Sequence, residues 1–299
     1  AWNGLTIKAR RCLVWIPLNK NKRGFAMRLL MTMALCCGFA VNVSATPESD
    51  REALRSYFEK RIPNVPLEEH INGAYALDEA KRAQWLAMED FPPYEFTIDE
   101  GADLWEEAFD NGETYASCFG DSPAIKAGFP YWDAEQGQVI TLDLAINQCR
   151  EANGEEALDY LGEEMAALTA FIAYESRDEL IAVEIPEDPA ALAAYESGKA
   201  FYYQRRGQLN FSCSSCHVDM ANNMLRAERL SAGIGHTTHW PVYRLKWNAV
   251  GPLHKRFMEC NDQVKAKSFA PQSEEYRNLE YFMTYMANDL PLNGPASRK

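Results

Sequence analysis

The chain has 299 residues, 47% of them hydrophobic, and a formal net charge of −13. This length is sufficient for two small domains, each with a core of its own. An acidic balance of this size argues against nucleic acid or an anionic membrane surface as a partner. We therefore expect no nucleic-acid partner, and the charge favours basic protein surfaces.

Residues 1–45 are interpreted as upstream sequence followed by a secretory signal peptide. An apolar run extends from Leu29 to Val41 behind a short basic stretch, and Val43-Ser44-Ala45 is a small-residue cleavage pattern. The run is too short to cross a bilayer stably, so we expect no membrane span. Cleavage near Ala45 would remove seven of the 30 basic residues and none of the 43 acidic ones. We expect the mature chain in the periplasm, where disulfides can form.

Residues 46–95 are predicted to be an acidic, moderately apolar N-terminal extension. Pro92-Pro93 predicts an extended connector there, because proline cannot continue a helix. We expect the extension to wrap the domains or to meet a partner, without a site of its own. His70 is expected at its surface.

Two helical domains are predicted to follow, over residues 96–180 and 181–299. In the second, Asp188-Pro189 is a favourable start for a helix, and Gly198 would let another helix approach closely. A last helix is predicted to begin after Ser273. Its apolar stripe is formed by Tyr276, Leu279, Phe282, Met283 and Met286. An early helix crossing a final helix predicts a mainly α fold class.

Cys213-Ser214-Ser215-Cys216-His217 is a C-x-x-C-H motif, which attaches c-type haem covalently. Thiols at this spacing can reach the two vinyl groups on one haem edge, and the imidazole of His217 then falls under the iron as an axial ligand. A thioredoxin-like pair, half of a zinc site and a chance match are the alternatives. The chain has no second C-x-x-C for zinc, and no βαβ pattern surrounds the motif. One covalently bound haem c is the predicted cofactor.

The two domains share a spacing pattern that indicates an internal repeat. Each has a glycine six residues before a cysteine, and a later cysteine 19 residues before a Leu-x-x-Phe-[Ile/Met]-x-Tyr pattern. The matched residues are Gly112 and Gly207, Cys118 and Cys213, Cys149 and Cys260, and Leu168 and Leu279. Two unrelated amphipathic helices are the alternative explanation. The repeat predicts two cytochrome c-like domains in tandem.

The first copy lacks the haem motif, because Asp121 and Ser122 stand where its second cysteine and its histidine would be. Without a porphyrin between them, Cys118 and Cys149 could meet. We predict a disulfide between these two residues, which would close a loop of about 30 residues and stabilise the domain by about 3–4 kcal/mol. The first domain is thus interpreted as one that has lost its haem.

The second axial ligand is open to several residue types. Met is the usual ligand in small electron-transfer cytochromes, and His is an occasional one. The candidates are Met220, Met224, Met258, His236, His239 and His254. Cys260 has the better claim, because the repeat places its counterpart at the haem slot. A thiolate ligand would favour ferric iron and lower the reduction potential.

A basic neighbourhood surrounds Cys260 in an otherwise acidic chain. Arg256 stands four residues before it and Arg244 lies further upstream, and the cluster is completed by Lys246, Lys255, Lys265 and Lys267. Cations favour a thiolate and can hold a small oxyanion. We expect Arg256, together with Arg244, to bind an anion beside Cys260; a solvated surface is the alternative.

Together these motifs resemble the SoxA family, the larger cytochrome subunit of the SoxAX thiosulfate-oxidising complex. The resemblance covers roughly residues 95–295. It is carried by Ile146-Asn147-x-Cys149-Arg150, Gly207-Gln208-Leu209-Asn210-x-Ser212-Cys213, Trp240-Pro241-x-Tyr243-Arg244, Arg256-Phe257-x-x-Cys260-Asn261 and Leu279-Glu280-Tyr281-Phe282.

The resemblance implies that His217 and Cys260 ligate an active-site haem, in the single-haem form where a disulfide replaces the first haem. It implies an L-cysteine S-thiosulfotransferase that couples thiosulfate oxidatively to a cysteine of the carrier SoxYZ and passes electrons to a soluble c-type cytochrome. Cys260 and Arg256 would be catalytic, with Arg244 beside the cofactor. A SoxX-like cytochrome subunit would complete a heterodimer. Whether Cys260 carries a persulfide is left open.

One departure from the family pattern concerns the last predicted helix. The resemblance leads us to expect an arginine near Tyr285 or Met286, but the next arginine of this chain is Arg298. Two other functions are compatible with the residues. An electron-transfer cytochrome would use Cys260 only to tune the iron, and a haem sensor would open one axial position to a gas ligand.

Overall fold

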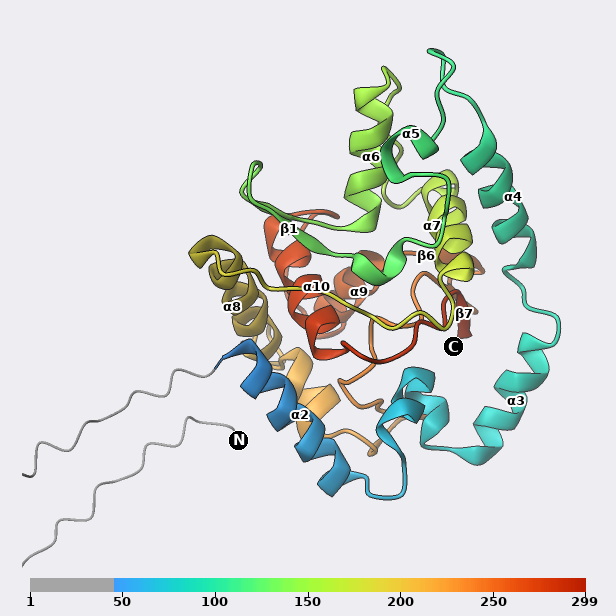
Figure 1. Ribbon diagram of the computed structural model, residues 1–299. Helices are drawn as coiled ribbons and strands as arrows, with labels where there is room; N and C mark the ends of the chain where they lie inside the picture. Colours follow the sequence, from blue (N-terminus) through green and yellow to red (C-terminus); the bar gives the residue numbers. More distant parts are fainter. Residues whose placement is uncertain (1–45) are drawn as a thin grey trace, which may run out of the picture. The chain divides into compact units, whose positions relative to one another are not determined.

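The computed structural model describes residues 46–299, where helices predominate and short strands pair in small sheets (Figure 1). The predicted signal peptide lies outside the described residues. Within them, no helix is long and apolar enough to cross a membrane. The helix-rich architecture agrees with the predicted fold class.

The elements follow one another in two stretches. The first contains α2 (Pro47–Arg61), η1 (Leu67–Ala76), α3 (Glu79–Glu89), α4 (Glu95–Glu106), α5 (Ala116–Phe119), η2 (Lys126–Gly128), β1 (Tyr131–Asp133), β2 (Gln138–Ile140), α6 (Leu142–Ala152) and α7 (Glu163–Glu175). The second contains α8 (Pro189–Tyr203), η3 (Ser215–Asp219), β3 (Met224–Leu225), β4 (Glu228–Arg229), β5 (Val242–Arg244), β6 (Ala249–Gly251), α9 (Leu253–Gln263), α10 (Glu274–Met286) and β7 (Ala296–Arg298).

Two pairs of helices cross closely, α4 with α7 and α8 with α10. In each pair the contact point is a glycine on the earlier helix. A Cβ atom on Gly101 would lie 2.1 Å from the carbonyl oxygen of Ala167, and one on Gly198 would lie 1.9 Å from that of Asn278. Both distances are far below van der Waals contact, so only glycine lets the backbones come this close. The close approach predicted at Gly198 is confirmed, and Gly101 has the same role in the other pair.

Between the members of each pair lies a β-hairpin followed by a helix. Strands β1 and β2 precede α6, and β5 and β6 precede α9. Both hairpins are antiparallel, with Trp132 opposite Val139 in one and Tyr243 opposite Val250 in the other. Strand β7 pairs with β5 in parallel. The same order of elements therefore occurs twice along the chain.

The N-terminal segment 46–95 is helical rather than extended, so that prediction is wrong. The helices α2, η1 and α3 occupy most of the segment, and Pro92-Pro93 lies in the short turn before α4. Leu54 and Phe58 of α2, four positions apart on one helix face, are buried. His70 is also buried rather than at the surface, with its ring 5.9 Å from that of Phe58.

Local hydrogen bonds set the ends of the other predicted helices. The Asp188 side chain accepts from the amide of Ala190, which confirms the N-cap of α8. Helix α10 begins after Ser273 as predicted, although the Ser273 hydroxyl makes no capping bond. Helix α4 ends at Glu106, so Phe109 reaches the core from the following turn.

Candidate functional site

Cys213, Cys216 and His217 of the C-x-x-C-H motif line a cavity of about 340 Å³, to which the N-terminal segment also contributes through Tyr75. The motif forms the turn η3 shortly after α8, and its thiols are free. Helices α8, α9 and α10 supply much of the remaining wall. The lining includes Phe201, Tyr202, Trp240, Leu253, Phe257, Leu279 and Met283. An apolar wall of this kind suits a flat hydrophobic group.

A hydrogen bond to the backbone fixes the orientation of the His217 ring. Its Nδ1 lies 3.0 Å from the carbonyl oxygen of Ser231. Because a carbonyl can only accept, Nδ1 carries the proton and Nε2 keeps its lone pair. Burial lowers the pKa of His217 to about 4, so the ring is neutral at neutral pH and can ligate a metal. This is the tautomer that an iron ligand requires.

The two motif cysteines are suited to forming thioethers. Burial, together with the charge of Cys260, raises the pKa of Cys213 to about 12 and also raises the pKa of Cys216. Both therefore remain thiols at neutral pH, the form whose S–H adds across a vinyl group. The cavity, the two thiols and the prepared imidazole together fit a covalently attached haem c.

Cys260 lines the same cavity as His217. It stands on α9, and Arg256 and Asn261 of the same helix also line the wall. The predicted proximity of Cys260 to the motif is thus seen in the structure. The methionine candidates Met220, Met224 and Met258 are not among the described residues that line the cavity.

The histidine candidates for the second axial position are placed differently. His236 and His239 line the cavity, and His239 is buried. The His236 ring lies 4.3 Å from that of His217, and its Nε2 is 3.0 Å from the Ser231 hydroxyl. His254 pairs instead with Glu280, with Nε2 3.0 Å from the carboxylate. Of the two cavity histidines, His236 is thus held against His217, and of the sulfur candidates named from the sequence Cys260 lines the cavity, as does Met283 of α10.

Arg256 and Arg244 both line the cavity, as the predicted anion site requires. Nη1 of Arg256 lies 3.1 Å from Glu259, whose carboxylate also accepts from Lys246 and Trp247. Burial alone would raise the pKa of Glu259, but these hydrogen bonds and the Arg256 charge lower it to about 2. Glu259 is therefore an anchor that holds Arg256 at the cavity.

The lysines of the predicted basic cluster do not gather at the cavity. Lys246 pairs with Glu259, and Lys255 lies over the ring of Trp247 at 4.7 Å. Lys265 and Lys267 line a separate surface hollow. Only the arginines of the cluster reach the site.

Arg298 is a cavity residue that the sequence analysis did not assign. The last helix indeed offers no arginine near Tyr285 or Met286: its arginine, Arg277, lies in its first turn, and Tyr285 hydrogen-bonds Glu48, with 3.3 Å between the oxygens. Strand β7 places Arg298 directly opposite Arg244 of β5. This strand pairing has no signature in a three-residue segment, so the sequence could not have indicated it.

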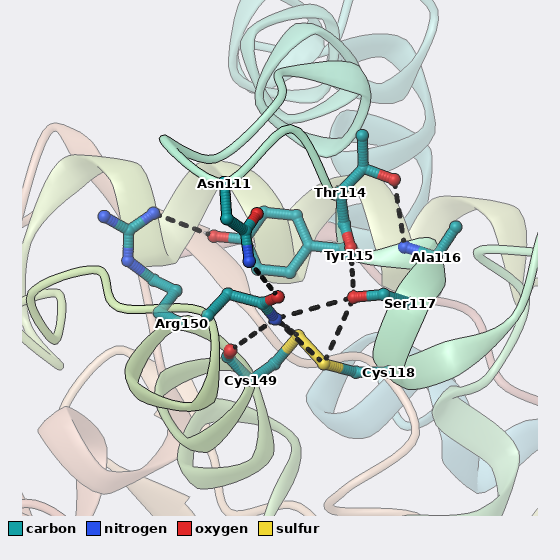
Figure 2. The surroundings of a disulfide bond; sticks show 9 residues. Asn111, Thr114, Tyr115, Ala116, Ser117, Cys118, Cys149 and Arg150 are labelled. Atoms are coloured by element: carbon teal, nitrogen blue, oxygen red, sulfur yellow. Dashed lines mark hydrogen bonds between the residues drawn. A yellow bond between two sulfur atoms is a disulfide. The ribbon is translucent and has the colours of Figure 1, made fainter.

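The first half of the chain contains the disulfide in the corresponding place. Cys118 and Cys149 are joined, with their Cα atoms 5.9 Å apart, which confirms the predicted pairing (Figure 2). The Asn153 amide lies 3.7 and 3.8 Å from the two sulfurs and donates to the Cys149 carbonyl. Nearby, Arg150 donates to the Tyr115 hydroxyl across 3.2 Å.

The chain matches the cytochrome c domain of the SoxA/TsdA family over residues 100–181. It is 53% identical to the L-cysteine S-thiosulfotransferase subunit SoxA of Allochromatium vinosum, over 93% of this chain and 100% of that protein. It is 48% identical to the subunit of the same name from Chlorobaculum tepidum, over 87% of this chain and 90% of that one. The crystal structure of SoxXA from P. pantotrophus aligns with a TM-score of 0.66 at 32% identity, covering 73% of this chain and 84% of that chain.

The crossing helices and the C-x-x-C-H cavity define a c-type cytochrome. The length and sequence identity of these matches identify one family within that class. The chain belongs to the SoxA family.

Proposed function

We propose that this protein is the catalytic haem subunit of an L-cysteine S-thiosulfotransferase. The observation that carries the proposal is that Cys260, His217 and two thiols of a haem-attachment motif line one cavity, beside Arg256 and Arg244. The names of its relatives support the same activity.

Cys213 and Cys216 would hold one haem c through thioethers, and His217 and Cys260 would ligate its iron. When bound, the haem supplies one-electron oxidising power next to the sulfur of Cys260. The first half is proposed to be a cytochrome c-like domain without haem, over residues 96–180, followed by the haem domain over 181–299. The repeated element order and the disulfide at the place of the lost motif support this single-haem, tandem arrangement.

The reaction joins the outer sulfur of thiosulfate to a carrier cysteine. One S–S bond forms, the carrier thiol loses its proton, and two electrons leave for a soluble c-type cytochrome. Arg256 and Arg244 would neutralise the sulfonate end of thiosulfate, and Cys260 would act as a sulfur nucleophile and leaving group. The accepted electrons require a second centre or a second encounter, because a haem takes one electron at a time.

A SoxX-like cytochrome subunit and a SoxYZ-like sulfur carrier are the proposed partners, and the periplasm is the proposed location. The aligned SoxXA structure supports the first partner. The export signal predicted in residues 1–45, the acidic mature chain and the disulfide support the location.

Replacing Cys260 tests the proposal. We expect Cys260→Ala and Cys260→Met to lower the rate of thiosulfate coupling to a carrier cysteine by about 100-fold or more, because the reacting sulfur is lost. Met258→Leu, two positions away on α9 and outside the cavity lining, is the matched control and should keep the rate. Mass spectrometry of each purified protein should find one haem.

If Cys260→Ala kept the wild-type rate of thiosulfate coupling, Cys260 would only tune the iron. The protein would then be an electron-transfer cytochrome. A gas ligand such as CO binding to the reduced wild-type protein, without turnover, would favour a sensor instead.

A further inference from the structure

Two arginines that line the cavity carry buried guanidinium nitrogens that lack hydrogen-bond partners among the described residues. Arg298 and Arg244 face each other across the β7–β5 pairing, and both line the cavity. Among the described residues, Nε and Nη2 of Arg298 and Nε of Arg244 have no hydrogen-bond partner. Burying guanidinium N–H groups unpaired is costly, so this arrangement calls for an anion.

The acidic side chains nearby are already engaged. Glu89 accepts from the indole N–H of Trp85 at 2.9 Å, from the amide of Ser297 at 2.8 Å and from the Tyr94 hydroxyl. Glu228 pairs with Lys81 at 2.9 Å. Glu259 is held by Arg256 and Lys246. None of these three carboxylates therefore supplies the anion that the two arginines require.

Arg298 is held in place by aromatic rings. Its guanidinium carbon lies 5.4 Å from the ring centres of both Tyr75 and Trp85, and its Nη1 donates to the Ser297 carbonyl. Burial, opposed by nearby acidic groups and reinforced by the charge of Arg244, lowers the pKa of Arg298 to about 10, so it stays charged at neutral pH. The site is thus a fixed pair of cations.

Both arginines line the same cavity as Cys213 and Cys216, the thiols that would capture the haem. In a haem, the two carboxylate side chains project from the porphyrin edge opposite the vinyl groups that cysteines capture. We propose that Arg298 binds a haem propionate carboxylate and so positions the haem within the cavity. This inference rests on the proposed haem attachment through Cys213 and Cys216.

The test uses the mature holoprotein and compares Arg298→Gln, Arg298→Lys and Arg226→Gln. Arg226 is an exposed arginine in the β3–β4 turn and serves as the charge-matched control. The readouts are the haem reduction potential from pH 5 to pH 8 and the KM for thiosulfate. Mass spectrometry first establishes that each variant carries haem.

For Arg298→Gln we expect a lower reduction potential at pH 8, because a cation that favours ferrous haem is gone. The difference from wild type should narrow toward pH 5, as the released propionate takes up a proton. Arg298→Lys should show a smaller shift and Arg226→Gln none, with the KM unchanged throughout.

Two results would overturn the inference while leaving the proposed function intact. One is a haem-loaded Arg298→Gln protein with the wild-type potential at every pH. The other is a raised KM for thiosulfate with an unchanged pH profile, which would make the substrate the bound anion. If the wild-type protein carried no covalent haem, both the proposed function and this inference would be wrong.

Discussion

The half built on α4 and α7 and the half built on α8 and α10 share their architecture but differ in what fills the centre. In the second half the crossing helices border a cavity with two thiols, an imidazole and Cys260. In the first half aromatic rings pack together, with Trp105 stacked 5.7 Å from Tyr115 and 6.1 Å from Phe119. A disulfide adds a covalent link there.

The comparison teaches that one helix arrangement can be completed in two ways. Cys149 and Cys260 occupy the same place in α6 and α9, each ahead of a helix that crosses at a glycine. Cys149 pairs with Cys118, whereas Cys213, the counterpart of Cys118, belongs to the haem-attachment motif. Cys149 is thus joined to Cys118 by a disulfide, whereas Cys260 remains a free thiol in the cavity.

The largest expected effect comes from the two crossing glycines. Gly198→Ala and Gly101→Ala should each lower the free energy of unfolding by roughly 4 kcal/mol or more, because a methyl group would press on a backbone carbonyl. Urea unfolding measures the loss. Gly198→Ala should also change the haem absorption spectrum, and Gly101→Ala should not.

Gly128→Ala is the matched control for these substitutions, because a Cβ there meets nothing within 4 Å. Its unfolding midpoint should stay close to that of the wild type. Equal tolerance of alanine at positions 101, 128 and 198 would show that the two helix crossings are not as tight as the structure indicates.

Removing the disulfide should have the next largest effect. Cys118→Ser/Cys149→Ser frees a loop spanning 31 residues and should cost about 3–4 kcal/mol of stability by chain entropy. The haem spectrum and potential should remain those of the wild type, since the crosslink lies in the other half. A shifted potential in this variant would show that the halves do not act independently.

Sequence reasoning succeeded where the chemistry is local or repeated. The Cys118–Cys149 pair and the contact at Gly198 each depend on spacings that the sequence displays, and the haem attachment at the C-x-x-C-H motif, which stays a prediction, depends on such a spacing too. Arg298 was missed because its place depends on a parallel pairing between short strands far apart in the chain. His70 was missed because the 3₁₀ turns of η1 lack the periodicity that reveals a buried face.

The smallest expected effect concerns the contact between the two halves of the chain. Asp143 and His254, the second residues of α6 and α9, are bridged by Gln272, which donates to each across 3.3 and 3.0 Å. Burial, reinforced by the charge of Glu280 and opposed by His254 and Lys126, raises the pKa of Asp143 to about 6. An acid whose pKa is raised on folding favours the folded state at low pH. Stability should therefore decline as the pH rises from about 4 to above 6.

Asp143→Asn removes this titration and should stabilise the protein at pH 8 by about 1–3 kcal/mol, with little difference at pH 4. Urea unfolding at both pH values measures the change, and Asp121→Asn, at an exposed position, is the control. The asparagine keeps a carbonyl oxygen that can accept from Gln272, so the bridge between the halves survives. A variant less stable than wild type at pH 8 would mean that the ionised carboxylate of Asp143 is needed there.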